Sequence, residues 1–304
     1  MRIGVMLGEG GVESQVKQVV AAENDGFDNV WFGQVFGLDA MTVIAIAGGQ
    51  TSRIEMGTSV VPTYARHPFV MAQQAMTVQA ATGSRFVLGI GLSHQPVIEG
   101  MWGMSYEHPA RHMKEYLSVL LPLVREGRVS FSGDVYRTAG AIRVPDMKPL
   151  PVMIAALAPR MLRLAGEMTD GTVTWMTGVK TIENHVVPSI HAAAKAAGRP
   201  DPRVAVGLPV CVSEDVAAAR EVAAKAFQIY GQLPNYRRML DKEGAGGPAD
   251  VAIVGNEGQV ERQIRAVASA GATDFFAPMF PVGADAAASL ARTRALLRSL
   301  VGNV

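Results

Sequence analysis

The sequence predicts an α/β fold in which eight parallel strands close into a (β/α)8 barrel. Three observations support this prediction. Short apolar runs recur along the whole chain, a segment with helical hydrophobic spacing follows each run, and the runs are continuous rather than alternating. Continuous hydrophobicity indicates strands that are covered on both faces, as parallel strands are. A doubly wound sheet would show the same pattern and is the alternative.

The apolar runs give eight strands in chain order. They are predicted at 2–7, 29–33, 54–61, 85–91, 151–156, 171–176, 204–212 and 274–280. The helices are predicted at 12–26, 39–51, 68–83, 109–126, 159–169, 180–197, 214–231, 257–271 and 284–301. Several of these helices end in a glycine that suits a C-cap, namely Gly26, Gly83, Gly198 and Gly271. One outer helix per strand, plus a last helix that closes the ring, predicts a single barrel domain over residues 1–304.

Three connections are longer than the usual ~2–6 residues. They span 92–108, 127–150 and 232–256. The second contains the segment 131–144, which predicts a small hairpin, and the third is glycine-rich, so we expect a mobile loop there. Long insertions of this kind commonly build or cover a site.

Composition and charge narrow the classes of partner. Of all residues, 49% are hydrophobic and 18% are charged, and 28 Lys and Arg nearly balance 27 Asp and Glu. No electrostatic field would therefore attract nucleic acid or an anionic membrane, and no apolar run reaches the ~18 residues of a membrane span. The lone Cys211 lies in an apolar run and predicts a buried strand residue without a disulfide. We expect a soluble, cytoplasmic protein whose partner is a small molecule.

The chemistry of a (β/α)8 enzyme lies where its strands end at the C-terminal face. Most residues at these positions are small or uncharged, and they include Gly8, Gln34, Ser59, Gly91, Ala155, Thr177 and Gly178. Such residues let a flat ring and a phosphate approach backbone amides, although ordinary turns also use them. The six histidines form no metal-binding motif, and a GxSxG nucleophile motif is absent, so we expect neither a metal nor a serine hydrolase.

Three stretches of the chain resemble the luciferase-like flavin superfamily, and in particular its coenzyme F420-dependent branch. They are AENDGFDNVWFGQ at 22–34, GTSVVPTYARHPFVMAQQAMTVQAATGSRFVLGIGLS at 57–93 and AALAPRMLRLAGEMTDGTVTW at 155–175. The third stretch is similar to methylenetetrahydromethanopterin reductases. Residues 254–278 also follow the family's closing helix and strand, so the similarity extends over nearly the whole chain.

The resemblance implies a cofactor, coenzyme F420 with FMN as the alternative, and a set of residues that would bind it. A non-proline cis peptide between Ser59 and Val60 would back the ring, and the turn after the fourth strand would lie beside it. The residues of that turn are Gly91, Leu92 and Ser93. The phosphate would be received by Ala155, Ala156, Leu157 and Ala158 together with Thr177 and Gly178. The resemblance also implies a homodimer formed through outer helices, for which the segment 70–81 offers a face.

The chain departs from the sugar-phosphate dehydrogenases of this branch at two places. They carry an Asp-His pair where this chain has Gly33 and Gln34, and a glutamate where it has His94. A hexose phosphate is therefore a doubtful substrate. His94 is the candidate proton donor because imidazole titrates near neutral pH, and a purely structural role suits it equally. Gln34 is the second candidate catalytic residue, and the residues predicted to line the substrate pocket, or only to pack, are Gln34, Thr63, Glu99 and Trp102.

The expected function is hydride exchange between the deazaflavin of coenzyme F420 and a small organic substrate. Two other functions are compatible with the sequence. One is an FMN-dependent monooxygenase that activates oxygen, and the other is a cofactor-binding protein without turnover. Titration with both cofactors separates the three.

Overall fold

Eight parallel strands close into a barrel in the computed structural model, which describes residues 1–7, 9–145 and 148–304. The candidate Gly8 lies outside the described residues. The strands are β1 (Arg2–Met6), β2 (Asn29–Phe32), β3 (Glu55–Thr58), β5 (Phe86–Gly91), β8 (Val152–Ala155), β9 (Gly171–Trp175), β10 (Arg203–Gly207) and β13 (Asp274–Ala277). They pair in the order β3-β2-β1-β13-β10-β9-β8-β5, and a β3–β5 pairing closes the ring. The barrel prediction is confirmed, and the doubly wound sheet is excluded because such a sheet has two open edges.

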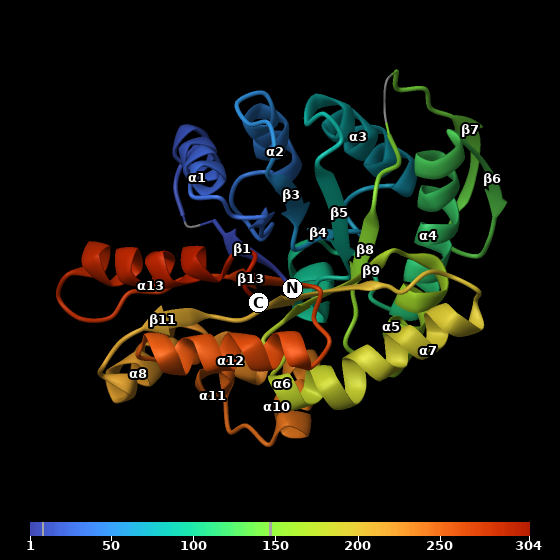
Figure 1. The fold of residues 1–304 in the computed structure, drawn as a ribbon. Helices are drawn as coiled ribbons and strands as arrows, with labels where there is room; N and C mark the ends of the chain where they lie inside the picture. The colour runs from blue at the N-terminus through green and yellow to red at the C-terminus, as the bar shows by residue number, and fades with distance from the viewer. Residues whose placement is uncertain (8, 146–147) are drawn as a thin grey trace.

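The outer helices surround the barrel as the hydrophobic spacing predicts (Figure 1). They are α1 (Val12–Asn24), α2 (Ala40–Gly48), α3 (Pro68–Ala81), α4 (Pro109–Glu126), α5 (Pro159–Met168), α7 (Val187–Ala196), α8 (Val216–Ala226), α12 (Glu257–Ser269) and α13 (Ala286–Leu300). The predicted helix at 180–197 is a continuous helical run made of α6 (Val179–Thr181), the π-helical turn η2 (Ile182–Val186) and α7. The four predicted capping glycines all have positive φ, between 59° and 99°.

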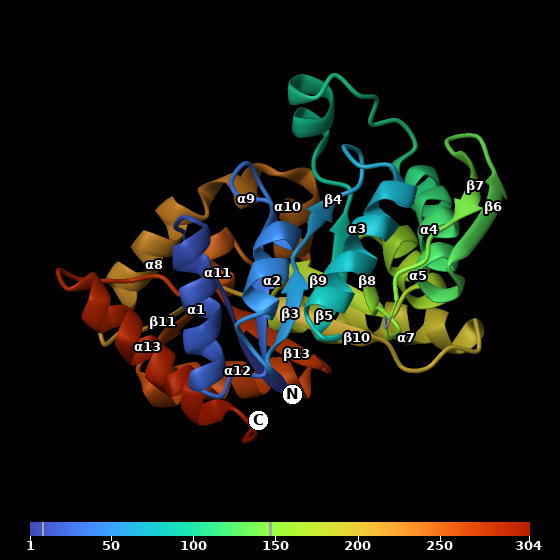
Figure 2. The ribbon, with the colours of Figure 1, turned by 90° about the horizontal axis from the view of Figure 1, so that it is seen from above.

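The three long connections have different structures. The hairpin is confirmed as β6 (Arg128–Ser132) paired antiparallel with β7 (Arg137–Ala141), beside α4. The first connection contains a π-helical turn, η1 (Pro96–Met101), and extends away from the barrel in Figure 2. The expectation of a loop at 232–256 is wrong. That stretch forms α10 (Pro234–Glu243), α11 (Pro248–Val251) and β12 (Ile253–Gly255), following a short α9 (Gln228–Gln232).

Physical reasons for this helical connection lie in its own sequence. Pro234 is the first residue of α10, and Gly244, with φ 78°, ends the helix. The side chains of Met239 and Leu240 on this helix are buried. Strand β12 pairs with β11 (Val210–Val212), which contains the buried Cys211, as predicted. The glycines that suggested a loop therefore separate short packed elements.

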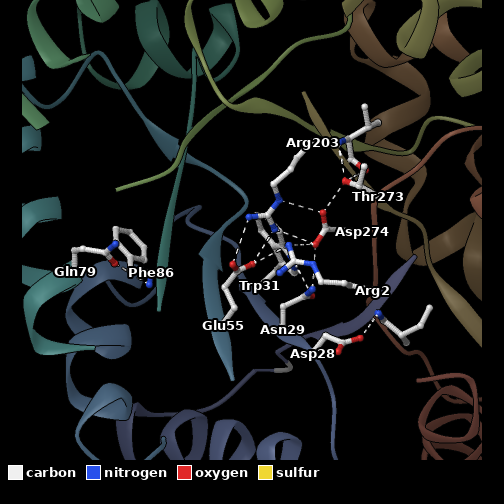
Figure 3. A network of polar contacts seen from close by, with 12 residues as sticks. Arg2, Asp28, Asn29, Trp31, Glu55, Gln79, Phe86, Arg203, Thr273 and Asp274 are labelled. Atoms are coloured by element: carbon white, nitrogen blue, oxygen red, sulfur yellow. Dashed lines mark hydrogen bonds and ion pairs between the residues drawn. The ribbon is translucent and has the colours of Figure 1, made fainter. Parts of the chain in front are cut away.

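Charged side chains fill the lowest layer of the barrel interior, at the N-terminal ends of the strands (Figure 3). Asp274 is completely buried and accepts hydrogen bonds from Arg203 Nη2 at 2.9 Å and Thr273 Oγ1 at 2.7 Å. Arg2 also pairs with Asp274. Glu55 completes the cluster, 2.8 Å from Arg203 and 3.1 Å from Arg2. We call these four charged residues, Arg2, Glu55, Arg203 and Asp274, the basal ion cluster.

The middle layer of the barrel is apolar and rests on the basal ion cluster. Its members pack on one another and are Trp31, Val87, Met153, Val173, Ala205 and Phe276. Asn29 links the layers, because its Nδ2 donates to Asp274 at 3.3 Å and its Oδ1 accepts from Trp31 Nε1 at 2.8 Å. The Trp31 and Phe276 rings stack with centroids 5.2 Å apart. Met6 and Val60 pack against this layer, so it is the floor of the barrel mouth.

Asp274→Ala tests the basal ion cluster. Its loss leaves two arginines without their shared buried carboxylate, so we expect the free energy of unfolding to fall by about 3–5 kcal/mol. Urea denaturation followed by circular dichroism measures it. Asp241→Ala, which breaks an exposed pair with Arg237 on α10, is the control, with an expected loss below about 1 kcal/mol. Equal losses in the two variants would contradict a stabilising role for the cluster.

Candidate active site

The uppermost layer of the barrel interior consists mainly of very small side chains. Residues alternate between the inside and outside of a barrel strand, which places in this layer Met6, Gly33, Ser59, Gly91, Ala155, Trp175 and Gly207. The space around the glycines agrees with this. A Cβ at Gly91 would lie 2.5 Å from Val60 Cγ2 and 3.4 Å from Ala155 Cβ, and one at Gly207 would lie 2.4 Å from the Phe276 ring. The uppermost layer thus contributes little side-chain volume to the barrel mouth, and Trp175 is its one aromatic residue.

A backbone bulge separates β3 from the short strand β4 (Val61–Pro62), at the edge of this floor. The Ser59–Val60 peptide bond is cis, as the resemblance implies. Ser59 N donates to Phe32 O at 2.7 Å, which ties the bulge to β2. Thr58 Oγ1 donates to Gly89 O at 2.7 Å and accepts from Gly89 N at 2.8 Å, which ties it to β5. Both neighbouring strands therefore fix the position of the bulge.

The turn after β5 carries Gly91, Leu92, Ser93 and His94 beside the bulge. Leu92 packs on the hydrophobic core, and Ser93 adopts a left-handed conformation with φ 58°. The carbonyl of Ser93 accepts a hydrogen bond from Tyr106 Oη at 3.3 Å, which anchors the turn to the long connection that follows. The structure thus brings the predicted turn residues together next to the bulge.

The imidazole of His94 lies half-buried under the helical connection that the sequence did not predict. Its ring centroid is 5.7 Å from that of Tyr236 on α10. Burial lowers the pKa of His94 below its usual value of 6.5, so the side chain is neutral at pH 7. A neutral imidazole has one nitrogen that can accept a proton.

The loops after β8 and β9 lie side by side because these strands pair. The first loop holds Ala155, Ala156, Leu157 and Ala158, and Ala158 opens α5 without a side-chain cap. His185 Nε2 lies 2.8 Å from Leu157 O, so η2, which follows the second loop, contacts the first. The first turn of α5 therefore offers backbone N–H groups to an anion.

The second of these loops holds Thr177 and Gly178, and the structure places a carboxylate there that the sequence did not predict. Thr177 Oγ1 donates to Trp175 O at 3.1 Å. Glu243, the last residue of α10, accepts hydrogen bonds from Thr181 N and Thr181 Oγ1, both at 2.8 Å, and from Lys180 N at 3.2 Å. The residues predicted to receive phosphate are thus adjacent to a negative charge on one side.

Polar side chains predicted to line the substrate pocket engage the loops around the mouth. Gln34 Oε1 accepts from Ala40 N at 3.2 Å, at the start of α2. Thr63 Oγ1 lies 3.0 Å from His112 Nε2. Glu99 accepts from Gln95 Nε2 at 2.8 Å, within the same connection as the half-buried Trp102. Gln34 and Glu99 thus hold loop conformations through these contacts, and their roles toward a substrate stay predictions.

Aromatic residues form two walls of the mouth, and sequence reasoning missed them. On one side the Tyr64 ring stacks on His112, with centroids 4.0 Å apart and planes 2° apart, and Tyr106 stacks on Tyr64. Burial lowers the pKa of His112 to about 4, so this wall is neutral. On the other side lie Trp175, Tyr230 and Tyr236, in contact with one another. Of these residues only Tyr106 and Tyr236 lie in the long connections, so their clustering could not be predicted from the sequence.

The described residues contain neither a candidate metal site nor a candidate membrane-spanning helix. No group of three or more His, Cys, Asp or Glu residues in this part of the chain is placed to hold a metal ion. Among the described helices, none combines the length and the apolar character needed to cross a bilayer.

The sequence matches the family model described as luciferase-like monooxygenase over residues 1–277. The chain is 31% identical to 5,10-methylenetetrahydromethanopterin reductase of Methanolobus tindarius over 67% of this chain and 62% of that protein. It is 32% identical to F420-dependent glucose-6-phosphate dehydrogenase of Intrasporangium calvum over 62% of each chain. Its fold is similar to that of coenzyme F420-dependent tetrahydromethanopterin reductase from Methanopyrus kandleri, with a TM-score of 0.79 and 22% identity over 100% of this chain and 98% of that one.

The family match extends over nearly the whole chain and includes every strand of the barrel. It also contains the three stretches, at 22–34, 57–93 and 155–175, that resemble the luciferase-like flavin superfamily. The protein therefore belongs to the luciferase-like monooxygenase family and is an enzyme of that family.

Proposed function

We propose that this enzyme is a coenzyme F420-dependent oxidoreductase that exchanges a hydride with a small organic substrate. The observation that carries the proposal is the floor of very small side chains beside the Ser59–Val60 bulge. The relatedness to an F420-dependent dehydrogenase supports the deazaflavin. The family's description as monooxygenases keeps FMN as the second candidate cofactor.

The residues at the mouth fit a flat ring. Gly91 lets the Val60 side chain pack directly on the backbone of β5, because a Cβ there would lie 2.5 Å from Val60 Cγ2. One buried polar atom of the mouth, Tyr64 Oη, has no hydrogen-bond partner within the described part of the chain. A polar group of a cofactor or substrate would give it a partner, as buried polar atoms require. The ring would rest on Ser59, Val60 and the turn Gly91–Ser93, and the phosphate on the first turn of α5.

When bound, the deazaflavin supplies the hydride chemistry, and the protein supplies orientation, exclusion of water and a proton. The bulge and the turn after β5 fix one face of the ring position. The aromatic walls restrict access of water to the other face. His94 holds or accepts the proton at its free imidazole nitrogen, because burial keeps it neutral at pH 7.

The loops around the mouth favour a neutral, apolar substrate. Within 33–39, 59–67 and 92–108, Arg66 is the single lysine or arginine, and it pairs with Asp39. These segments also expose large apolar side chains, namely Val35, Phe36, Met101 and Met104. A phosphorylated sugar would find no unpaired cation there, which agrees with the replacement of the dehydrogenases' Asp-His pair by Gly33 and Gln34 and of their glutamate by His94.

Titration of the purified protein with F420 and with FMN tests the cofactor. We expect F420 to bind more tightly, as followed by quenching of cofactor fluorescence. Gly91→Ala places a methyl group against Val60, so it should weaken F420 binding about tenfold or more. Gly100→Ala is the matched control, because a Cβ there has no atom within 4 Å. Tighter FMN binding with flavin-dependent oxygen consumption would instead establish a monooxygenase, and binding of neither would refute both.

His94→Gln tests the proton-transfer role. In the direction of substrate oxidation, the wild-type rate should rise with pH through a pKa below 6.5, because the neutral imidazole is the active form. His94→Gln should lower turnover by about 10²–10⁴-fold and remove this limb of the pH profile. His191→Gln, on the outer helix α7, is the control. A variant that keeps the wild-type pH profile would assign His94 a structural role.

We also propose that two copies of the enzyme associate through α3. Val70 is exposed on this helix, on a face that it shares with the exposed Gln73, Thr77 and Ala81, while both methionines are buried. Sedimentation analysis should give a dimer for the wild type and a monomer for Val70→Glu, because a buried carboxylate opposes association. An unchanged dimer in the variant would place the contact elsewhere.

A further inference from the structure

The carboxylate of Glu243 lies at the start of a helical run to which Glu243 does not belong. Glu243 ends α10, yet its carboxylate lies at the first turn of the helical run formed by α6, η2 and α7. There it accepts hydrogen bonds from Lys180 N at 3.2 Å and from Thr181 N and Oγ1 at 2.8 Å each. These are the kinds of donor that a phosphate oxygen would use.

The absence of a side chain at Gly178 makes room for this carboxylate. A Cβ at that position would lie 2.3 Å from Glu243 Cδ and 2.6 Å from its Oε1. The backbone φ of Gly178 is −72°, which any residue can adopt. The glycine is therefore needed for the close approach of Glu243 and not for its backbone conformation.

The negative charge of Glu243 is not neutralised by a cation. Within the described residues its partners are two backbone N–H groups and one hydroxyl, and no lysine or arginine side chain pairs with it. The charge also lies near the loop 155–159, since β8 and β9 pair and His185, in the same helical run as Thr181, lies 2.8 Å from Leu157 O. The carboxylate of Glu243 would therefore repel a phosphate on the first turn of α5.

The two candidate cofactors differ in the charge of their phosphate. Coenzyme F420 carries a phosphate diester with one negative charge. FMN carries a monoester, whose charge at pH 7 is about −1.5 to −2. An unpaired carboxylate nearby therefore opposes FMN more strongly than F420.

We propose that Glu243 is a cofactor-specificity residue that disfavours the phosphate monoester of FMN relative to the diester of F420. The inference rests on the proposed function, because it places the cofactor phosphate at the loop 155–159. Glu243 acts through its charge across the two adjacent loops and does not contact the ring.

Glu243→Gln separates charge from geometry. The amide oxygen of glutamine can accept both hydrogen bonds of Thr181, which go to one carboxylate oxygen, while the longer one from Lys180 N, at 3.2 Å to the other oxygen, is lost together with the charge. We expect FMN affinity to rise on the order of fivefold and F420 affinity to rise less. Riboflavin, which has no phosphate, should bind the variant and the wild type equally. Fluorescence titrations measure all three dissociation constants, and the gain for FMN should shrink as salt screens the charge.

Asp241→Asn is the matched control, because it removes a carboxylate from the same helix that pairs with Arg237 at 2.8 Å. It should leave the ratio of the FMN and F420 affinities unchanged. An unchanged ratio in Glu243→Gln would overturn the proposal, and so would an equal gain for riboflavin, which would reveal a change of geometry. If the wild type bound neither F420 nor FMN, the proposed function itself would be refuted. That result is distinct from an unchanged affinity ratio and from an equal gain for riboflavin.

Discussion

The barrel depends on the pairing of two arginines with two carboxylates inside its lower end. Burial raises the pKa of both Asp274 and Glu55, and the guanidinium group of Arg2 opposes that shift, while Arg203 pairs with both carboxylates. The cluster is balanced in charge and draws its members from four strands that are far apart in sequence. Its hydrogen-bond chain continues through Asn29 to the indole of Trp31. Because Trp31 belongs to the layer on which Val60 packs, the charged base sets the height of the floor at the mouth.

The histidine and tyrosine side chains around this floor are neutral. The imidazoles of His94 and His112 are neutral because burial lowers their pKa values. Burial likewise raises the pKa of Tyr64 and Tyr236, so both hydroxyls keep their protons. A neutral, aromatic enclosure strengthens the few polar contacts made inside it. It agrees with the proposed exchange of a hydride with an uncharged substrate.

The sequence predicted the repeating elements well and the mouth only in part. Period and length identified all eight barrel strands, and glycines with positive φ marked the helix ends. The resemblance located the cis peptide at Ser59–Val60, which local propensity does not indicate. The glycines at 232–256 led to the wrong prediction of a loop, because Gly244 ends a helix there. Glu243 could not be predicted, since its role comes from contact with a helix more than 60 positions earlier.

Helix α10 has one further consequence for the enzyme. Tyr236 and Glu243 are seven residues apart, which is about two helical turns, so both lie on the same face of α10. One of them touches the imidazole of His94, and the other holds the first turn of α6. A tilt of this helix would therefore change the surroundings of His94 and the first turn of α6 together. Helix α10 thus couples the proposed proton-transfer residue to the loops that are proposed to hold the cofactor phosphate.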